Sequence, residues 1–173
     1  RRHDREIKMT DVFIGIGSNV DREKNITSCV NELRGIFPDL RVSPVYETSS
    51  MGFKGPNFFN LVCKFSTHEK LTNLKKVLNK IEIEHGRTFG EEKFSSRTLD
   101  IDILYYGDLI LVSDEIKLPR DEITRYDFVL KPLVDIAPDF IHPIRQLTNE
   151  RILMDNDVEK LIIKKIDLQL KWI

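Results

Sequence analysis

The chain has 173 residues, of which 40% are hydrophobic and 32% charged, and its formal net charge is -1. This length suits one well-filled core and is short for two, so a single domain is expected. The near-neutral charge gives no general argument for binding nucleic acid or an anionic membrane, and no apolar run approaches the roughly 20 residues that span a bilayer.

The first half of the chain alternates strand and helix patterns. Residues 11–17 form a short apolar run that ends in a Gly-Ser-Asn turn, which predicts a buried strand. Apolar side chains at three- and four-residue spacing predict a helix over 25–36, with Asp21 or Asn19 as its cap. Cys29 lies in this helical pattern and is expected, like Cys63, to be a buried free thiol in a reducing compartment.

Two further strands are expected near residues 40–47 and at 58–66. Thr67 can then cap a second helix, whose apolar stripe extends to about Glu84, and Gly86 is a natural stop. A polar loop leads from there to the next strand. The resulting order, βαββαβ, predicts an α+β fold of the ferredoxin-like type, with two helices on one face of an antiparallel four-stranded sheet and the other face free.

The second half of the chain adds elements to this core. The sequence predicts a hairpin around residues 107–108, a helix over 126–136, and a C-terminal run of ambiguous period. We expect residues 1–9 to be a charged arm or linker, 10–157 to be the domain, and 158–173 to be an extension. No signal-peptide pattern opens the chain, so a cytoplasmic location is expected, or an organellar matrix in a eukaryote.

Two aspartates stand out in the stretch Arg97-Thr-Leu-Asp100-Ile-Asp102. Strand side chains alternate between faces, so Asp100 and Asp102 share one face at a separation of roughly 7 Å. Two such anions repel each other, and one or two divalent cations are the simplest compensation, for which hard carboxylate ligands suit Mg²⁺. The alternative is a solvent-facing strand with two surface aspartates and Arg97 as their counter-ion.

Six blocks of sequence, found in the same order, resemble the 6-hydroxymethyl-7,8-dihydropterin pyrophosphokinase family of folate biosynthesis. The blocks are residues 15–19, 43–48, 57–60, 82–87, 97–102 and 128–133. The resemblance spans about residues 10–155, and Arg-Thr-Leu-Asp-x-Asp is its most specific part. It implies transfer of pyrophosphate from MgATP to the hydroxymethyl group of the pterin, with release of AMP, on a ferredoxin-like fold.

The resemblance also implies residue roles at the phosphates. Asp100 and Asp102 would hold two Mg²⁺ ions, and Arg87 and Arg97 would clamp the ATP phosphates with the bidentate fork that lysine lacks. Alternatively, the two arginines pair with the acidic residues of the polar loop. The other positions implied for ATP are Glu82, Ile103, Lys117 and Arg120.

For the pterin, the resemblance implies contacts from Thr48, Met51, Phe58, Asn60, Phe94 and Phe128. Phe94 and Phe128 would hold the flat ring between two aromatic faces, and Asn60 would recognise its hydrogen-bonding edge. Otherwise these phenylalanines are ordinary core residues. The loop over residues 86–96 is expected to act as a lid that brings Arg87 and Phe94 over the site and excludes water.

Several positions depart from the usual family pattern. Ser95 and Ser96 replace a Gly-Pro pair, and Arg120 follows Leu-Pro where a histidine is expected. Tyr126 occupies the place of an arginine two residues before the last phenylalanine of the site. Since a tyrosine cannot supply positive charge to a phosphate, either Arg120 and Arg125 reach the site from altered positions or turnover is reduced.

The sequence is also compatible with other function classes. The same fold could be a diverged, weakly active or non-catalytic module that binds pterin or nucleotide. An RNA-binding ferredoxin-like domain would need stacking aromatics in a basic motif, which the sequence lacks, and no P-loop motif is present. The expected partners are therefore ATP and hydroxymethyldihydropterin, and because the family occurs fused to other folate enzymes, dihydropteroate synthase or dihydroneopterin aldolase are candidate fusion partners.

Overall fold

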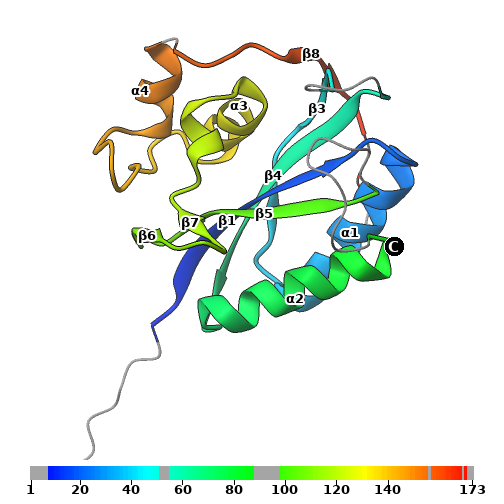
Figure 1. The fold of residues 1–173 in the computed structure, drawn as a ribbon, viewed down its shortest axis with the longest axis horizontal. Helices are drawn as coiled ribbons and strands as arrows, with labels where there is room; N and C mark the ends of the chain where they lie inside the picture. The colour runs from blue at the N-terminus through cyan, green and yellow to red at the C-terminus, as the bar shows by residue number, and fades with distance from the viewer. Residues whose placement is uncertain (1–7, 51–54, 88–97, 156, 169, 171–173) are drawn as a thin grey trace, which may run out of the picture.

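The protein is built on an antiparallel sheet, shown in a computed structural model that describes residues 8–50, 55–87, 98–155, 157–168 and 170 (Figure 1). Among these residues, the sheet has the order β5-β1-β4-β3-β8, and β2 also pairs with β4. Its strands are β1 (Thr10–Ser18), β2 (Arg41–Val42), β3 (Val45–Thr48), β4 (Phe58–Thr67), β5 (Asp100–Tyr106) and β8 (Ile162–Ile166). The helices are α1 (Arg22–Ile36), α2 (Leu71–Glu84), α3 (Asp127–Ile136) and α4 (Asn149–Met154), with a 3-10 turn, η1 (Asp121–Thr124).

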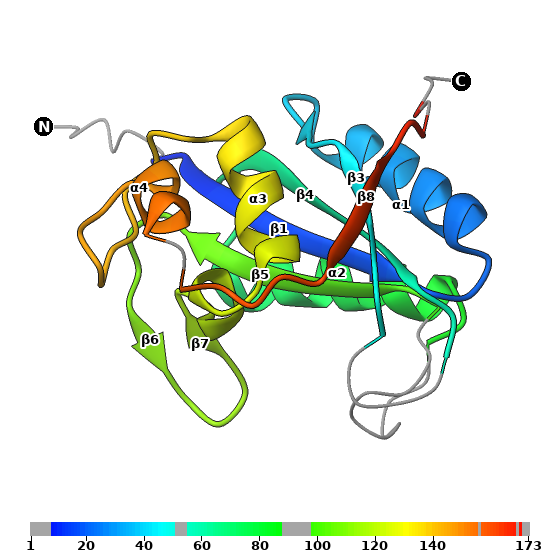
Figure 2. The ribbon, with the colours of Figure 1, turned by 90° about the horizontal axis from the view of Figure 1, so that it is seen from above.

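The side-chain alternation of β1 explains how the layers form. Val12, Ile14 and Ile16 belong to a core with α1 and α2, whereas Phe13 belongs to a second core with α3. Figures 1 and 2 show α1 and α2 on one side of the sheet and α3 and α4 on the other. The predicted α+β order is confirmed, but the expectation of a free second face is wrong, because apolar side chains of α3 pack against Phe13.

The spacing of apolar residues explains why α1 forms, and a backbone hydrogen bond of Asp21 marks where it begins. Ile26, Cys29 and Leu33 recur at three- and four-residue intervals and are buried. Asp21 occupies the cap position with φ 43°, and its carbonyl oxygen accepts from the amide of Asn25 at 2.9 Å, while its side chain makes no capping bond. Both Cys29 and Cys63 are buried and free, as expected.

The start of α2 differs from the sequence expectation, and its end agrees with it. Thr67 is the last residue of β4, and Lys70 occupies the cap position of α2, so the prediction that Thr67 caps this helix is wrong. The Thr67 hydroxyl oxygen instead accepts from the amide of Glu69 at 3.0 Å. Gly86 has φ 89°, and its amide donates to the carbonyl oxygen of Ile83, which ends the helix as glycine commonly does.

The predicted hairpin lies further along the chain than expected. Gly107, with φ 54°, turns the chain at the end of β5. The next strand, β6 (Leu111–Val112), pairs with β7 (Lys117–Leu118) and not with β5. The hairpin therefore turns at residues 113–116, and its placement at 107–108 was wrong, because a glycine turn can end a strand without folding the chain back onto it.

The ambiguous C-terminal run contains β8, which extends the sheet beyond β3. Val45 pairs with Ile166, and Thr48 pairs with Ile162. The run is thus part of the sheet, although the division into arm, domain and extension stays a prediction. Among the described residues, no helix is both long and apolar enough to cross a bilayer.

Candidate active site

A cavity of about 410 Å³ opens on the face of the sheet that carries α3. Residues from distant parts of the sequence line it: Gly15, Gly17, Thr48, Phe58, Asn60, Arg87, Asp100, Asp102, Arg120, Arg125, Tyr126 and Phe128. The predicted metal ligands and four of the six predicted pterin contacts thus face one volume. Its size suits a small molecule rather than a macromolecule.

Two glycines of β1 form the floor of this cavity. Gly15 pairs with Asp102 and Gly17 with Asp100, so both lie beside the aspartates. A Cβ atom added at Gly17 would lie 2.7 Å from the Asn60 Oδ1 atom, whereas one at Gly15 would lie 3.6 Å from the nearest atom of Leu104. In the sequence these glycines belong to a turn and to a motif block, but their i and i+2 spacing in a strand was the available signal for a floor on one face.

The aspartate pair lies on the cavity side of β5, as strand alternation predicted. Asp100 and Asp102 both line the cavity, while Ile101 and Ile103 are buried in the core with α1 and α2. Each aspartate faces an arginine: the Arg87 Nη1 atom lies 2.6 Å from the Asp100 Oδ1 atom. The Arg120 Nη2 atom lies 3.6 Å from the Asp102 Oδ1 atom.

The electrostatics of the pair fit a cation. Burial, followed by the negative charge of Asp100, raises the pKa of Asp102 to about 8, and Arg120 offsets this only in part. The charged form of Asp102 is therefore costly in this site unless a further cation compensates it. Among the described residues, no group of three or more Asp, Glu, His or Cys side chains is arranged so that it could hold a metal ion. Two carboxylates alone suit Mg²⁺, which commonly takes its other ligands from water and substrate phosphates.

The side chain of Glu82 is buried behind the cavity wall and does not line the cavity. Its side chain is 2% exposed, its Oε2 atom accepts from the amide of Ile101 at 2.9 Å, and it forms an ion pair with Arg87. Burial raises the pKa of Glu82 to about 7, while the Ile101 amide and Arg87 lower it. Glu82 thus joins α2 to β5 and holds Arg87 next to Asp100. In this arrangement it would reach ATP through Arg87 rather than by direct contact.

The departures from the family pattern also meet at the cavity. Arg120 and Arg125 both line it, which agrees with the alternative in which they reach the site from altered positions. Arg120 pairs with Glu122 as well as with Asp102. Tyr126 stacks on Phe128 with ring centroids 5.3 Å apart, so it extends an aromatic wall. Glu122 carried no motif signal in the sequence, and Tyr126 was treated only as a lost charge.

The other end of the cavity is polar and aromatic. The Asn60 Nδ2 atom donates to the Thr48 Oγ1 atom at 2.7 Å, and Thr48 is 1% exposed. This bond fixes the Asn60 amide over Gly17, where its oxygen faces the floor. Phe58 and Phe128 contribute apolar walls. Such a combination suits a flat ring with hydrogen-bonding groups at its edge.

Some predicted site residues lie elsewhere. Lys117 pairs with Asp121 at 3.0 Å and does not line the cavity. The side chain of Ile103 is in the opposite core, so only its backbone, on the edge strand β5, is available to a ligand. Met51, Phe94, Arg97 and the lid from residue 88 onward lie outside the described residues, and their roles stay predictions.

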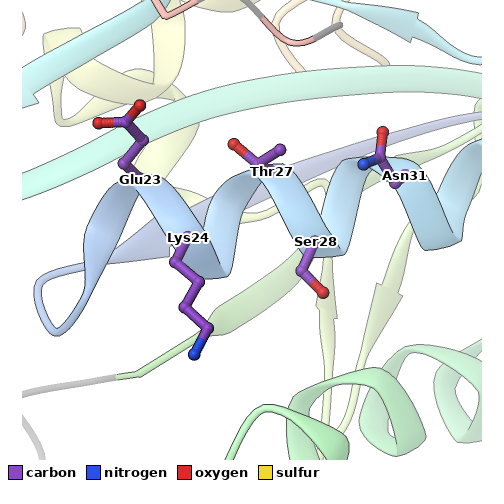
Figure 3. Close-up of a pocket in the computed structure, with 5 residues that line it drawn as sticks. All are labelled: Glu23, Lys24, Thr27, Ser28 and Asn31. Carbon is purple, nitrogen blue, oxygen red and sulfur yellow. The ribbon is translucent and has the colours of Figure 1, made fainter. Parts of the chain in front are cut away.

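A second hollow lies on the outer face of α1, where Glu23, Lys24, Thr27, Ser28 and Asn31 line it (Figure 3). All five side chains come from a single helix, and none belongs to the six blocks of sequence. One polar helix face without a second wall cannot enclose a ligand. The cavity over β1 is therefore the candidate active site.

Comparison with known proteins points to one family. Residues 13–138 match the family model described as 7,8-dihydro-6-hydroxymethylpterin-pyrophosphokinase (HPPK). The chain is 36% identical to a 2-amino-4-hydroxy-6-hydroxymethyldihydropteridine pyrophosphokinase of Aquifex aeolicus, covering 79% of this chain and 86% of that protein. It is also 36% identical to the folic acid synthesis protein FOL1 of Dictyostelium discoideum, covering 83% of this chain but 22% of that protein.

Solved structures support the fold. The HPPK-DHPS protein of Plasmodium falciparum superposes with a TM-score of 0.67 at 13% identity, covering 88% of this chain and 46% of that chain. At this identity the likeness concerns the fold alone. This chain thus spans less than half of that protein and about a fifth of FOL1, whereas it spans most of the Aquifex protein.

Proposed function

Since this chain belongs to the 7,8-dihydro-6-hydroxymethylpterin-pyrophosphokinase family, we propose that it transfers pyrophosphate from MgATP to 6-hydroxymethyl-7,8-dihydropterin and releases AMP. One observation carries the proposal: a single cavity joins the aspartate pair of β5 to an amide and aromatic pocket between β3, β4 and α3. The first end suits a metal-bound triphosphate, and the second suits a flat heteroaromatic alcohol.

Asp100 and Asp102 would hold Mg²⁺, and two ions remain the expectation. The fit rests on two carboxylates that face one cavity, where burial and the neighbouring Asp100 make the charged form of Asp102 costly without a cation. A bound metal would neutralise phosphate charge as the transfer proceeds. Arg87 and Arg120 already face the two carboxylates, so they can turn to the phosphate oxygens once a cation takes their place.

The reaction needs the protein to position the substrates and to neutralise phosphate charge, and it needs no covalent intermediate with the protein. The hydroxymethyl oxygen of the pterin attacks the β-phosphorus of ATP, the bond to the α-phosphate oxygen breaks, and AMP leaves with that oxygen. The hydroxyl proton passes to solvent. Asn60, held by Thr48, and the Phe58 and Phe128 walls would orient the ring so that its alcohol faces the aspartate end.

A coupled AMP-release assay tests the proposed function. With ATP, Mg²⁺ and the dihydropterin alcohol together, AMP should form at a rate proportional to protein, and omission of the pterin or addition of EDTA should stop it. Binding of both ligands by titration without any AMP would instead support the non-catalytic binding module. The roles predicted for Arg97 and Phe94, which lie outside the described residues, need separate variants.

The wider setting of the chain is also a proposal. The FOL1 and HPPK-DHPS relatives are much longer than this chain, which supports fusion to dihydropteroate synthase as its natural arrangement. Fusion to dihydroneopterin aldolase and a cytoplasmic or organellar location stay predictions.

The glycine floor gives a prediction with a built-in control. Replacing Gly17 with alanine should weaken pterin binding about tenfold, because the new Cβ would lie 2.7 Å from the Asn60 Oδ1 atom and displace the amide. Replacing Gly15 with alanine places its Cβ at an ordinary 3.6 Å from Leu104 and should cost much less. Titration of the pterin into both variants measures the difference, and equal losses would show that Asn60 is not the reason.

A further inference from the structure

A short strap, residues 157–162, connects α4 to the sheet and lies outside the family match, which ends at residue 138. Figure 2 shows this segment passing one end of α3 before it enters β8 beside β3. The strap therefore touches two elements that are far apart in the sequence. Both of them carry walls of the cavity.

The first end of the strap is held at the start of α3. The amide of Asp127 donates to the carbonyl oxygen of Glu159 at 3.0 Å, and the amide of Glu159 donates to the carbonyl oxygen of Arg125 at 2.7 Å. The two carboxylate oxygens of Asp127 accept from the amides of Leu161 at 2.9 Å and Ile162 at 3.2 Å. One side chain thus satisfies two consecutive backbone donors, in the charge-assisted form that is the stronger kind of hydrogen bond.

The second end of the strap is held by β3. The amide of Ser49 donates to the carbonyl oxygen of Leu161 at 3.3 Å, and Ile162 pairs with Thr48. Thr48 and Ser49 line the cavity on this side, and Tyr126 and Phe128 line it on the other. The backbone of Leu161 is therefore bonded to both sides at once.

We propose that Asp127 is a positioning residue for the pterin, because it fixes the strap that sets the spacing between the Thr48 wall and the Phe128 wall. This inference rests on the proposed function. Within the part of the chain that the structure describes, the hydrogen bonds of the strap go to Arg125, Asp127 and β3, and none goes to β5. The aspartate pair is held instead by β1, Arg87 and Arg120. The effect of opening the strap should consequently fall on the pterin and spare MgATP.

The test is the Asp127→Asn variant, which keeps the size of the side chain but turns an NH₂ group toward a backbone amide that needs an acceptor. Calorimetric titrations would use 6-hydroxymethylpterin in the presence of magnesium and α,β-methylene-ATP, and the nucleotide analogue with magnesium alone. We expect pterin affinity to fall about tenfold while the affinity for the nucleotide analogue stays within about twofold of the parent. Hydrogen exchange at Leu161 and Ile162 should become faster.

Asp155→Asn is the matched control, because it makes the same chemical change at an exposed ion pair with Arg151, 3.6 Å apart, which is worth little. It should change neither titration. Faster exchange in Asp127→Asn with unchanged pterin affinity would overturn the inference, as would unchanged exchange or an equal loss of both ligands. If the parent chain bound no pterin and released no AMP, the proposed function itself would fail, and this inference with it.

Discussion

Replacing Asp100 or Asp102 with asparagine should reduce AMP release by about 10³-fold or more. Each change removes half of the carboxylate pair that would hold magnesium, and metal stabilisation of transferring phosphate is worth several kcal/mol. The fold should persist, because each change also removes repulsion between two like charges on one strand face. Initial rates at saturating ATP, pterin and Mg²⁺ measure the first effect, and thermal unfolding of metal-free protein measures the second.

Asp108→Asn provides the control for these two variants. Asp108 is exposed and lies two residues after the end of β5, so its change alters net charge by the same amount without touching the cavity. It should keep the parent rate. Near-normal AMP release in Asp100→Asn or Asp102→Asn would contradict magnesium binding by this pair, whereas lowered stability in metal-free buffer would contradict the charge repulsion between them.

The part of the site that the sequence predicted depends on local rules. Strand alternation alone predicts that Asp100 and Asp102 share one face, and both do line the cavity. Helical spacing likewise predicted the buried face of α1. Both rules concern neighbours a few positions apart, and the ordered blocks of the family pattern supplied the long-range order that local rules lack.

The parts that the sequence could not supply depend on contacts between distant segments. Glu122, Asp127 and β8 carry no motif, and each acquires its role from a partner that only the folded chain brings near. Tyr126 was treated as a missing charge, yet its ring stacks on Phe128. A residue that departs from the family pattern can thus take a different role through a contact with its neighbour, and the sequence alone does not show that contact.

Charge in the cavity is arranged as carboxylates that share arginines. Arg87 pairs with both Glu82 and Asp100, and Arg120 pairs with both Glu122 and Asp102. Asp100 and Asp102 are the proposed metal ligands of the two sets. Glu82 and Glu122 are the carboxylates that pair only with the arginine. When a cation binds Asp100 and Asp102 and displaces the two arginines from them, Glu82 can still hold Arg87, and Glu122 can still hold Arg120. Both guanidinium groups thus stay close to where the phosphates would lie.

Arg87→Ala should therefore lower the free energy of unfolding by about 3 kcal/mol at pH 8, because it removes the cation that lowers the pKa of the buried Glu82 and also leaves Asp100 without that partner. The loss should be smaller at pH 5. Burial already raises the pKa of Glu82 from 4.5 to about 7, so below that value the carboxyl can be buried in its neutral form. A raised pKa means stability that is present at low pH and lost as pH rises through the folded-state value. Urea unfolding at both pH values measures the difference.

Lys80→Ala is the control for the pH-dependent loss of stability in Arg87→Ala, because it also removes a cation that pairs with a glutamate. Lys80 is 79% exposed and lies 3.8 Å from Glu84. Its change should cost little at either pH, as exposed helix pairs do. Equal destabilisation of Arg87→Ala at pH 5 and pH 8 would mean that Glu82 is not the group left uncompensated. A larger loss at pH 8 would mean instead that the arginine at the proposed phosphate position is also what keeps a buried carboxylate charged, so that its removal costs stability as well as catalysis.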